Sequence, residues 1–352
     1  MEKQSRWQEN KIARKKNDRK EDSRKDAIKN SRKRDNRKDS QKEAAGKKGN
    51  GKERYGERAE MMREQQENIM QNQISEQKAR LEKRMRELAA GDICLAFSGG
   101  VDSSLLLKAA VDAVAETGKK VYAVTFDSRL HPACDLEIAG QVAKELGGIH
   151  QVISIDELEQ ADIRMNPKNR CYLCKRRLFS SLKEFAEEKK SSCILDGTNE
   201  DDMHVYRPGI QALGELGIIS PLAELHITKA EVKALASLYG ISVASRPSTP
   251  CMATRIPYGM ELNYEILTRI GEGEAFLREL FSGNVRLRLH GNVARIELDP
   301  ECLEQVLIKR ELVIRRLKEL GFPYVTLDLE GFRSGSMDLF IEKQTPDSSA
   351  VL

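Results

Sequence analysis

The residues best suited to chemistry lie in one run of small and polar side chains, Ser98 to Ser104, with the sequence SGGVDSS. Its two glycines let the backbone turn tightly and approach a ligand without a Cβ clash. The run follows a short apolar segment and precedes a helical pattern, and free N–H groups at a helix start bind anions. The lysine of a Walker A loop is missing. An ordinary glycine-rich turn is the structural alternative to a phosphate site.

The phosphate-site interpretation assigns ATP contacts to seven residues and Mg²⁺ ligands to three. The predicted ATP contacts are Ser98, Gly99, Gly100, Asp102, Ser103, Ser104 and, at the end of the next strand, Asp127 with Ser128 beside it. The predicted Mg²⁺ ligands are Asp102, Glu200 and Asp201. Mg²⁺ is bound in such sites by one or two carboxylates together with phosphate oxygens. A polar strand end at Asp127 and a solvated acidic turn at 200–202 are the alternatives.

Three arginines stand on segments rich in turn-forming residues. Arg207 follows the acidic segment, and Arg246 and Arg255 flank a run rich in Pro, Ser and Thr. A guanidinium can hold phosphate or carboxylate with two parallel hydrogen bonds. We therefore predict that Arg207 and Arg255 bind the phosphate or carboxylate groups of a substrate, with Arg246 as a further candidate. Ordinary surface arginines are the alternative.

Three of the seven cysteines stand where they can do chemistry. Cys171 and Cys174 form a CxxC pair at the start of a helical pattern, and Cys251 lies on the loop before Arg255. The helix start and the basic residues around the pair are expected to lower a thiol pKa. Three thiolates can hold three irons of a 4Fe–4S cluster and leave the fourth iron open for sulfide. Incidental thiols and a redox dithiol are the alternatives, whereas two cysteines alone are too few for a closed zinc site.

These residues need a scaffold that brings strand ends together, and the pattern of the chain predicts one. Apolar strand patterns at 93–97, 120–126, 151–155 and 193–196 alternate with helical patterns at 103–116, 136–146, 171–189 and 228–239. Cys94 and Cys193 fall inside these apolar runs and are predicted to be core residues. Alternating strands and helices imply a doubly wound parallel sheet, whose ligands bind at the carboxyl ends of the strands. Residues 90–260 are therefore assigned to an α/β domain.

The pattern changes after Gly259 and predicts a smaller α+β domain over residues 261–340. Strands are expected at 285–290 and 293–298, joined by the Gly291–Asn292 turn, with a helix from 300 to 320 and a strand at 324–329. Residues 58–89 form a helical segment by the spacing of their apolar side chains. The short tail at 341–352 is predicted to be disordered.

The charge of the chain is concentrated at its start. Residues 1–60 hold 22 Lys and Arg against 12 Asp and Glu, whereas the whole chain has a net charge of +4. Residues 1–57 carry few apolar side chains, so we predict a disordered, basic tail that solubilises the protein or binds a nucleic acid. The chain shows no secretory signal and no apolar run of membrane-spanning length. With an odd number of cysteines, this indicates a cytoplasmic protein in a reducing compartment without a membrane partner.

Several motifs together resemble one known family. SGGVDSS, the segment NRCYLCK at 169–175, DGTNEDD at 196–202 followed by YRPG, PCMATRIPYG at 250–259 and GFRSGSMD at 331–338 are similar to those of the LarE family. This is a family of sulfur transferases within the PP-loop ATP pyrophosphatases. The resemblance covers residues 77–338 and implies the adenine nucleotide α-hydrolase-like fold. It also implies that ATP is split between its α- and β-phosphates.

The resemblance carries further expectations about the reaction. It implies that ATP and Mg²⁺ adenylylate a carboxylate of a pyridinium dicarboxylate mononucleotide, and that sulfur is then inserted to give a thiocarboxylate of the nickel-pincer nucleotide pathway. The sulfur donor is either a sacrificed cysteine or a sulfide on a cluster. The pattern of Cys171, Cys174 and Cys251 favours the cluster. The family also implies a homo-oligomer.

Three other functions remain open on the sequence. A tRNA thiolase would share the phosphate loop, the CxxC pair and a cluster, and the basic tail would hold its RNA. An ammonia-dependent synthetase would have no need of the CxxC pair. A non-catalytic nucleotide-binding scaffold would release no pyrophosphate.

Overall fold

The computed structural model describes residues 62–63, 65–66, 69–131, 133–204, 208–244, 246 and 250–333, without the side chains of 133 and 134. The chain divides into two units, one ending at Gln73 and the other beginning with Ile74. The described residues of the first unit are helical. The predicted tails at 1–57 and 341–352 lie outside the described residues.

A four-stranded parallel sheet forms the centre of the second unit. Its strands are β1 (Ile93–Ala96), β2 (Val121–Ser128), β3 (Ile149–Ile155) and β4 (Cys193–Leu195), in the order β3-β2-β1-β4. The predicted doubly wound α/β class is confirmed. The chain passes outward from β1 to β3 and then returns to place β4 beside β1. The carboxyl ends of β1 and β4 therefore flank the point where the strand order reverses, which is where such sheets bind ligands.

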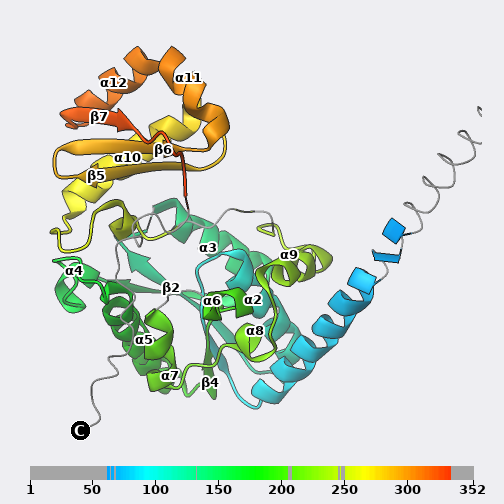
Figure 1. Cartoon of the computed structure of the whole chain (residues 1–352). Helices are drawn as coiled ribbons and strands as arrows, with labels where there is room; N and C mark the ends of the chain where they lie inside the picture. The colour runs from blue at the N-terminus through cyan, green and yellow to red at the C-terminus, as the bar shows by residue number, and fades with distance from the viewer. Residues whose placement is uncertain are drawn as a thin grey trace, which may run out of the picture. The chain divides into compact units, whose positions relative to one another are not determined.

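Helices cover both faces of this sheet (Figure 1). The helix at 74–88, α2 (Val101–Val114), α3 (Ala133–Glu145) and α9 (Lys229–Leu238) pack their apolar sides into one core with β1. On the other face, α5 (Arg170–Lys189) and α7 (Gly209–Leu216) pack against side chains of β2 such as Val124. Cys94 is buried in β1 as predicted, and Cys193 is half-buried and packs against the first core.

Short helices follow several strand ends and shape the ligand edge of the sheet. They are α4 (Glu157–Gln160), α6 (Glu200–Met203) and α8 (Pro221–Glu224). Asn199 caps α6 through a reciprocal capping box with Asp202, and Thr228 caps α9 in the same way with Glu231. These local hydrogen bonds satisfy N–H groups that have no partner in the first helical turn.

A second core lies in the C-terminal part of the unit. It is built from a 3₁₀ turn η1 (Met252–Arg255), α10 (Tyr264–Leu280), β5 (Val285–His290), β6 (Val293–Leu298), η2 (Pro300–Cys302), α11 (Leu303–Ile308), α12 (Arg310–Glu319) and β7 (Tyr324–Leu327). β5 and β6 pair as the predicted antiparallel hairpin, and β7 joins β6 in parallel. The smaller α+β fold is confirmed.

Two features of this part differ from the sequence prediction. The helix expected from 300 to 320 is interrupted at Lys309, which is the last residue before α12 and leaves the helical conformation. The long helix α10 was not predicted, because Gly271 and Gly273 lie inside its pattern and glycine disfavours helices. Gly273 allows close packing there, since a Cβ would lie 2.6 Å from Cδ2 of Leu287 and would have to displace that side chain.

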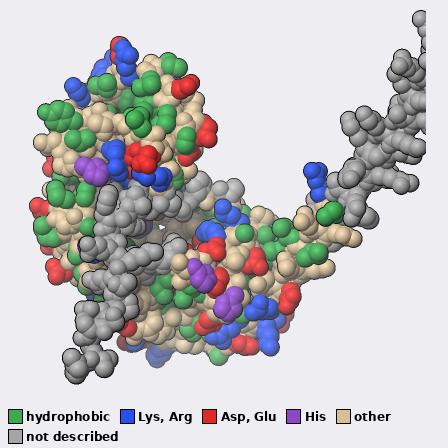
Figure 2. All heavy atoms as spheres, in the orientation of Figure 1, with side chains coloured by type: hydrophobic (Ala, Val, Ile, Leu, Met, Phe, Trp, Pro, Cys, Tyr) green, Lys and Arg blue, Asp and Glu red, His purple; other side chains and the backbone are tan. Residues whose placement is uncertain are grey.

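The surface of the second unit is of mixed charge. Figure 2 shows acidic and basic side chains interspersed over the visible face of its described residues. None of the helices in the described ranges combines the length and the apolar character that crossing a bilayer requires.

Candidate active site

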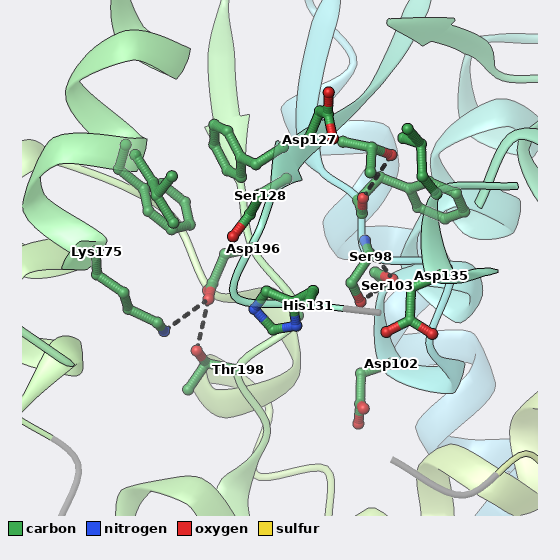
Figure 3. Close-up of a pocket in the computed structure, with 18 of the residues that line it drawn as sticks. Ser98, Asp102, Ser103, Asp127, Ser128, His131, Asp135, Lys175, Asp196 and Thr198 are labelled. Atoms are coloured by element: carbon green, nitrogen blue, oxygen red, sulfur yellow. Dashed lines mark hydrogen bonds and ion pairs between the residues drawn. The ribbon is translucent and has the colours of Figure 1, made fainter. Parts of the chain in front are cut away.

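A cavity of about 360 Å³ opens at the carboxyl ends of β1, β2 and β4 (Figure 3). It lies at the predicted switch point of the sheet. The walls combine polar groups with the aromatic rings of Phe126 and Phe179. The polar residues that line it include Ser98, Asp102, Ser103, Asp127, Ser128, His131, Asp135, Lys175, Asp196, Thr198 and Asp202. A cavity of this size, with few polar groups on a partly apolar wall, is typical of a small-molecule site.

The phosphate loop forms one wall of this cavity. Gly99 has a φ of +68°, and a Cβ there would lie 2.9 Å from Cα of Ala139 in α3. Only glycine combines this conformation with so close a neighbour. The hydroxyls of Ser98 and Ser103 lie 3.3 Å apart, and Ser103 donates to the carbonyl oxygen of Gly100 at 3.1 Å. The loop is thereby fixed at the start of α2, with hydroxyls and N–H groups at the cavity.

Four of the seven predicted ATP contacts line the cavity, and three do not. Ser98, Asp102, Ser103 and Asp127 line it, whereas Gly99 and Gly100 supply the turn behind them. Asp127 accepts a hydrogen bond from the Ser154 hydroxyl at 3.1 Å. Ser104 is fully buried, and its hydroxyl has no hydrogen-bond partner among the described residues. The prediction for Ser104 is therefore not supported by the geometry, because its side chain points into the core.

The opposite wall comes from the end of β4 and from α5. Asp196 accepts hydrogen bonds from the hydroxyls of Thr198, at 2.6 Å, and Ser220. Lys175 of α5 lies 3.9 Å from the same carboxylate (Figure 3). Gly197 lets this segment approach the phosphate loop, since a Cβ there would lie 3.1 Å from the Ser103 nitrogen. Lys175 and Asp196 thus stand across the cavity from the phosphate loop.

The three predicted magnesium ligands have different surroundings, and only Asp102 is among the residues that line the cavity. Asp102 lines the cavity, where it accepts hydrogen bonds from Asn199, at 3.0 Å, and from the ammonium group of Lys229. Glu200 instead lies between two imidazoles, 2.7 Å from His204 and 2.9 Å from His226. Asp201 accepts from the Lys229 backbone nitrogen at 2.9 Å. Neither Glu200 nor Asp201 is among the residues that line the cavity, whereas the next residue, Asp202, is.

The cysteines gather around a buried arginine. Arg170 is 4% exposed; it donates to Asn166 and to the carbonyl oxygen of Ala253 at 3.3 Å. Arg170 directly precedes Cys171 in the chain, and Ala253 lies two residues after Cys251. Cys174 and Cys251 pack against the same apolar core. The structure therefore brings the CxxC helix and the Cys251 loop to one place.

The expected lowering of a thiol pKa is wrong for two of the three cysteines. Burial raises the pKa of Cys174 well above its usual range, and it raises that of Cys251 as well. The positive charge of Arg170 lowers both pKa values but does not outweigh desolvation. Both sulfurs are therefore held as thiols at neutral pH.

The donor atoms of this site are those that iron–sulfur clusters use, but their arrangement does not fit one. Among the residues that the structure describes, no group of three or more His, Cys, Asp or Glu is placed to hold a metal ion.

Two of the three predicted anion-binding arginines, Arg255 and Arg246, form ion pairs with carboxylates of the protein itself. Arg255 is 1% exposed, and its guanidinium contacts Glu274 at 2.7 and 3.0 Å. It also donates to Thr254 Oγ1 at 2.8 Å and so braces the Cys251 turn. Arg246 pairs with Asp135 at 2.5 Å. Arg207 lies outside the described residues, and Arg255 is committed to a buried carboxylate, so we do not retain Arg255 as a substrate contact.

Two residues at the site were missed as functional candidates. Lys175 follows Cys174 and was considered only for its effect on the thiols, whereas it reaches the cavity. Glu157 is 1% exposed and accepts a hydrogen bond from the Ser128 hydroxyl. The only sequence signal for Glu157 was its position directly after the strand at 149–155, since strand ends line the ligand edge.

Comparison with known proteins places this geometry in a family. A PP-loop domain model matches residues 71–205. The chain is 40% identical to an uncharacterized protein of Synechocystis, over 71% of this chain and 92% of that protein. It is 36% identical to pyridinium-3,5-bisthiocarboxylic acid mononucleotide synthase of Lactiplantibacillus plantarum, over 75% of this chain and 95% of the synthase. An ammonia-dependent NAD⁺ synthetase of Aeropyrum pernix is more distant, at 28% identity over 57% of this chain.

The PP-loop match contains the wall formed by residues 98–104. The chain belongs to the LarE family and is an ATP-dependent sulfurtransferase of the PP-loop ATP pyrophosphatase superfamily.

Proposed function

We propose that this enzyme adenylylates a carboxylate of a pyridinium dicarboxylate mononucleotide, releases pyrophosphate, and inserts sulfur to form a thiocarboxylate in nickel-pincer nucleotide biosynthesis. The acceptor is taken from the name of the L. plantarum synthase. One observation carries the proposal: α5 presents Lys175 to the cavity of the phosphate loop and carries Cys171 and Cys174 on the same turn. This arrangement supports activation and sulfur delivery at neighbouring positions of one helix.

In the activation step, the phosphate loop holds the β- and γ-phosphates of ATP while the acceptor carboxylate attacks the α-phosphate. The hydroxyls of Ser98 and Ser103 and the N–H groups at the start of α2 stabilise the leaving pyrophosphate. Lys175 adds positive charge from the opposite wall. Magnesium bound to the phosphates supplies further charge neutralisation, with Asp102 as the one predicted ligand that lies at the cavity.

In the second step, sulfur replaces AMP on the activated carboxyl group. We propose that the sulfur comes from the group of Cys171, Cys174 and Cys251, whose helix and loop meet at Arg170. Where one of these cysteines is the donor, its sulfur bonds to the acyl carbon, the C–O bond to AMP breaks, and the Cβ–S bond then breaks with loss of the Cα proton to leave dehydroalanine. The 4Fe–4S cluster implied by the family resemblance stays a prediction. Anaerobic reconstitution, followed by iron and sulfide determination, tests it.

The first experiment incubates the enzyme with ATP, Mg²⁺ and pyridinium-3,5-dicarboxylate mononucleotide. We expect AMP and pyrophosphate in equal amounts and a thiocarboxylate product by mass spectrometry. ADP and orthophosphate in their place would overturn the proposal. Cys171→Ser, Cys174→Ser and Cys251→Ser should each retain AMP formation and lose at least about 10²-fold in thiocarboxylate formation, because a nucleophile or sulfur carrier is removed. Cys193→Ser, outside this group, is the matched control.

The tRNA thiolase alternative is not favoured by the relatives described above. It would require the basic tail to bind RNA, and that tail lies outside the described residues. A gel shift with tRNA separates the two functions. Self-association of the enzyme and its cytoplasmic location are further proposals; sedimentation and cell fractionation test them.

A further inference from the structure

The nucleotide cavity carries more negative than positive side chains. Among the described residues that line it, one is a lysine and five are aspartates: Lys175, Asp102, Asp127, Asp135, Asp196 and Asp202. Lys175 is itself near a carboxylate, since its ammonium group lies 3.9 Å from Asp196. The triphosphate of ATP is also negative, and like charges repel most strongly where water is partly excluded. Holding ATP in this cavity therefore requires positive charge from further groups.

Lys229 places an ammonium group next to this cavity. It is the first residue of α9, and its ammonium group donates a hydrogen bond to Oδ2 of Asp102. Oδ1 of the same carboxylate accepts from the Asn199 side chain at 3.0 Å. Asp102 lines the cavity and is the second residue of α2, the helix that begins at the phosphate loop (Figure 3). The ammonium group is therefore one hydrogen bond away from the wall that the phosphate loop forms.

The packing of α9 fixes the backbone of Lys229 and leaves its ammonium group accessible. α9 and α2 share one apolar core, to which α9 contributes Val232 and Leu235. The Lys229 backbone nitrogen donates to Asp201 at 2.9 Å and ties the start of α9 to α6. The side chain is 35% exposed, and a lysine stem is flexible. A change of rotamer can therefore move the ammonium group without moving the helix.

The ion pair between Lys229 and Asp102 is of a kind that exchanges readily. Both partners are open to water, because the Asp102 side chain is also 21% exposed. Such pairs contribute little to the stability of a protein, since water screens the charges and both side chains lose freedom in the pair. Phosphate oxygens form short, charge-assisted hydrogen bonds with an ammonium group. An entering triphosphate can therefore compete with Asp102 for Lys229.

We propose that Lys229 is a phosphate-binding residue of the ATP site, which is paired with Asp102 in the free enzyme and moves its ammonium group to phosphate oxygens when ATP enters. The proposal rests on the proposed function and deepens it, because it adds a cation from α9 to the activation step. The exchange also frees Oδ2 of Asp102. That oxygen is then available to the magnesium that accompanies ATP, which is bound by one or two carboxylates together with phosphate oxygens.

A different role for Lys229 gives a different result. If Lys229 only neutralised Asp102, it would act on ATP through that carboxylate and would become irrelevant once the carboxylate is removed. If Lys229 binds the phosphates directly, its contribution remains when Asp102 is replaced. A double-mutant cycle on the two residues separates the direct contact from the indirect effect.

The test measures ATP binding by calorimetric titration in EDTA, without the acceptor, so that neither metal nor catalysis contributes. We expect Lys229→Met to weaken ATP binding by about 10- to 100-fold, the loss of one hydrogen bond to a charged group. Adenosine, which has no phosphate, should bind as it does to wild type. Lys229→Arg keeps the charge and should bind ATP more tightly than Lys229→Met. Lys233→Met, at an exposed position of the same helix, is the matched control and should change neither affinity.

The decisive comparison is made in the Asp102→Asn background. Asp102→Asn removes the ion pair but keeps the ammonium group, so metal-free ATP should bind more tightly than to wild type. Adding Lys229→Met should again weaken ATP binding by about 10-fold or more. This comparison stands even if Lys229→Met alone does not fold, because the double variant leaves no unpaired carboxylate.

Equal ATP affinities of Asp102→Asn and the double variant would overturn the inference, since Lys229 would then act only through Asp102. A loss of adenosine affinity equal to the loss of ATP affinity in Lys229→Met would overturn it as well, because the effect would not come from the phosphates. A wild-type enzyme that binds ATP but forms no AMP with Mg²⁺ and pyridinium-3,5-dicarboxylate mononucleotide would overturn the proposed function instead.

Discussion

At the scale of single residues, the site depends on positions where only one side chain fits both the backbone and its neighbours. Gly99 is such a position, because its φ of +68° coincides with a close approach to α3. Gly118 has nearly the same φ, +67°, but nothing lies within 4 Å of its would-be Cβ. Comparing substitutions at these two glycines therefore separates the cost of the left-handed backbone from the cost of the steric conflict at the phosphate loop.

We predict that Gly118→Ala lowers the free energy of unfolding by about 1 kcal/mol, the usual cost of a left-handed alanine. Gly99→Ala should cost more, by about 1–3 kcal/mol in addition, because Ala139 or the loop must move. Only Gly99→Ala should weaken ATP binding. Urea denaturation and calorimetric titration with ATP measure the two effects. Equal losses of ATP affinity in both variants would contradict a special role for the loop.

At the scale of elements, a helix cap determines where a side chain near the site lies. Thr228 closes a capping box with Glu231 at the start of α9, and the next residue, Lys229, reaches Asp102 at the cavity. The local sequence thus fixes where α9 begins, and this fixes where the Lys229 side chain lies.

Thr228→Ala should lower the free energy of unfolding by about 1 kcal/mol, because the α9 cap is lost. The matched control is Thr268→Ala in α10, whose hydroxyl only donates back to the Tyr264 carbonyl oxygen at 2.9 Å within the helix. That variant should stay within about 0.5 kcal/mol of wild type. Chemical denaturation of both proteins measures the two losses of unfolding free energy. Equal losses would show that the capping-box hydroxyl of Thr228 is no more stabilising than the hydroxyl of Thr268 within a helix.

Elements with local signals were predictable from the sequence, and contacts between distant residues were not. The hairpin of β5 and β6 was predicted to the residue, because Gly291–Asn292 is a strong turn signal between alternating strands. Strand and helix ends elsewhere moved by one to three residues. The partners of Arg255, Glu157 and Lys229 lie 19, 29 and 127 residues away in the chain. No local pattern specifies such pairs, so Arg255 was taken for a surface anion binder and Glu157 was missed.

At the scale of the whole molecule, one buried ion pair connects the cysteine loop to the C-terminal core. Arg255 belongs to the turn after Cys251, and Glu274 belongs to α10; both side chains are 1% exposed. Glu274 also accepts from the Leu287 nitrogen in β5 at 3.0 Å, and Arg288 of the same strand donates to the Thr254 carbonyl oxygen at 2.7 Å. The C-terminal sheet thereby fixes the loop on which Cys251 stands.

We predict that Arg255→Met lowers the free energy of unfolding by about 3–5 kcal/mol, because it leaves a buried carboxylate without its partner. Arg278 contacts the same carboxylate at 2.5 Å, but its side chain is 44% exposed. Arg278→Met should therefore cost less than about 1 kcal/mol. Guanidinium denaturation measures both variants. Similar losses would mean that burial of the pair has no energetic importance.

The pH dependence of stability follows from the same pair. Burial raises the Glu274 pKa, but the hydrogen bond and charge of Arg255 outweigh it and leave the pKa below its usual value. The stability that this carboxylate contributes is complete above the unfolded-state pKa of about 4.3 and is lost as the pH falls toward the lower folded-state pKa. Thermal unfolding measured across this range should show a smaller acid-side loss for Arg255→Met than for wild type.

The opening turn of α5 has one more consequence. Cys174 and Lys175 are neighbours there, and Gly209 lets α7 press so closely that a Cβ would lie 2.7 Å from Cδ of Lys175. Because Lys175 lines the nucleotide cavity and Cys174 precedes it in the same closely packed turn, a substitution at Gly209 that displaces Lys175 should also displace the neighbouring sulfur.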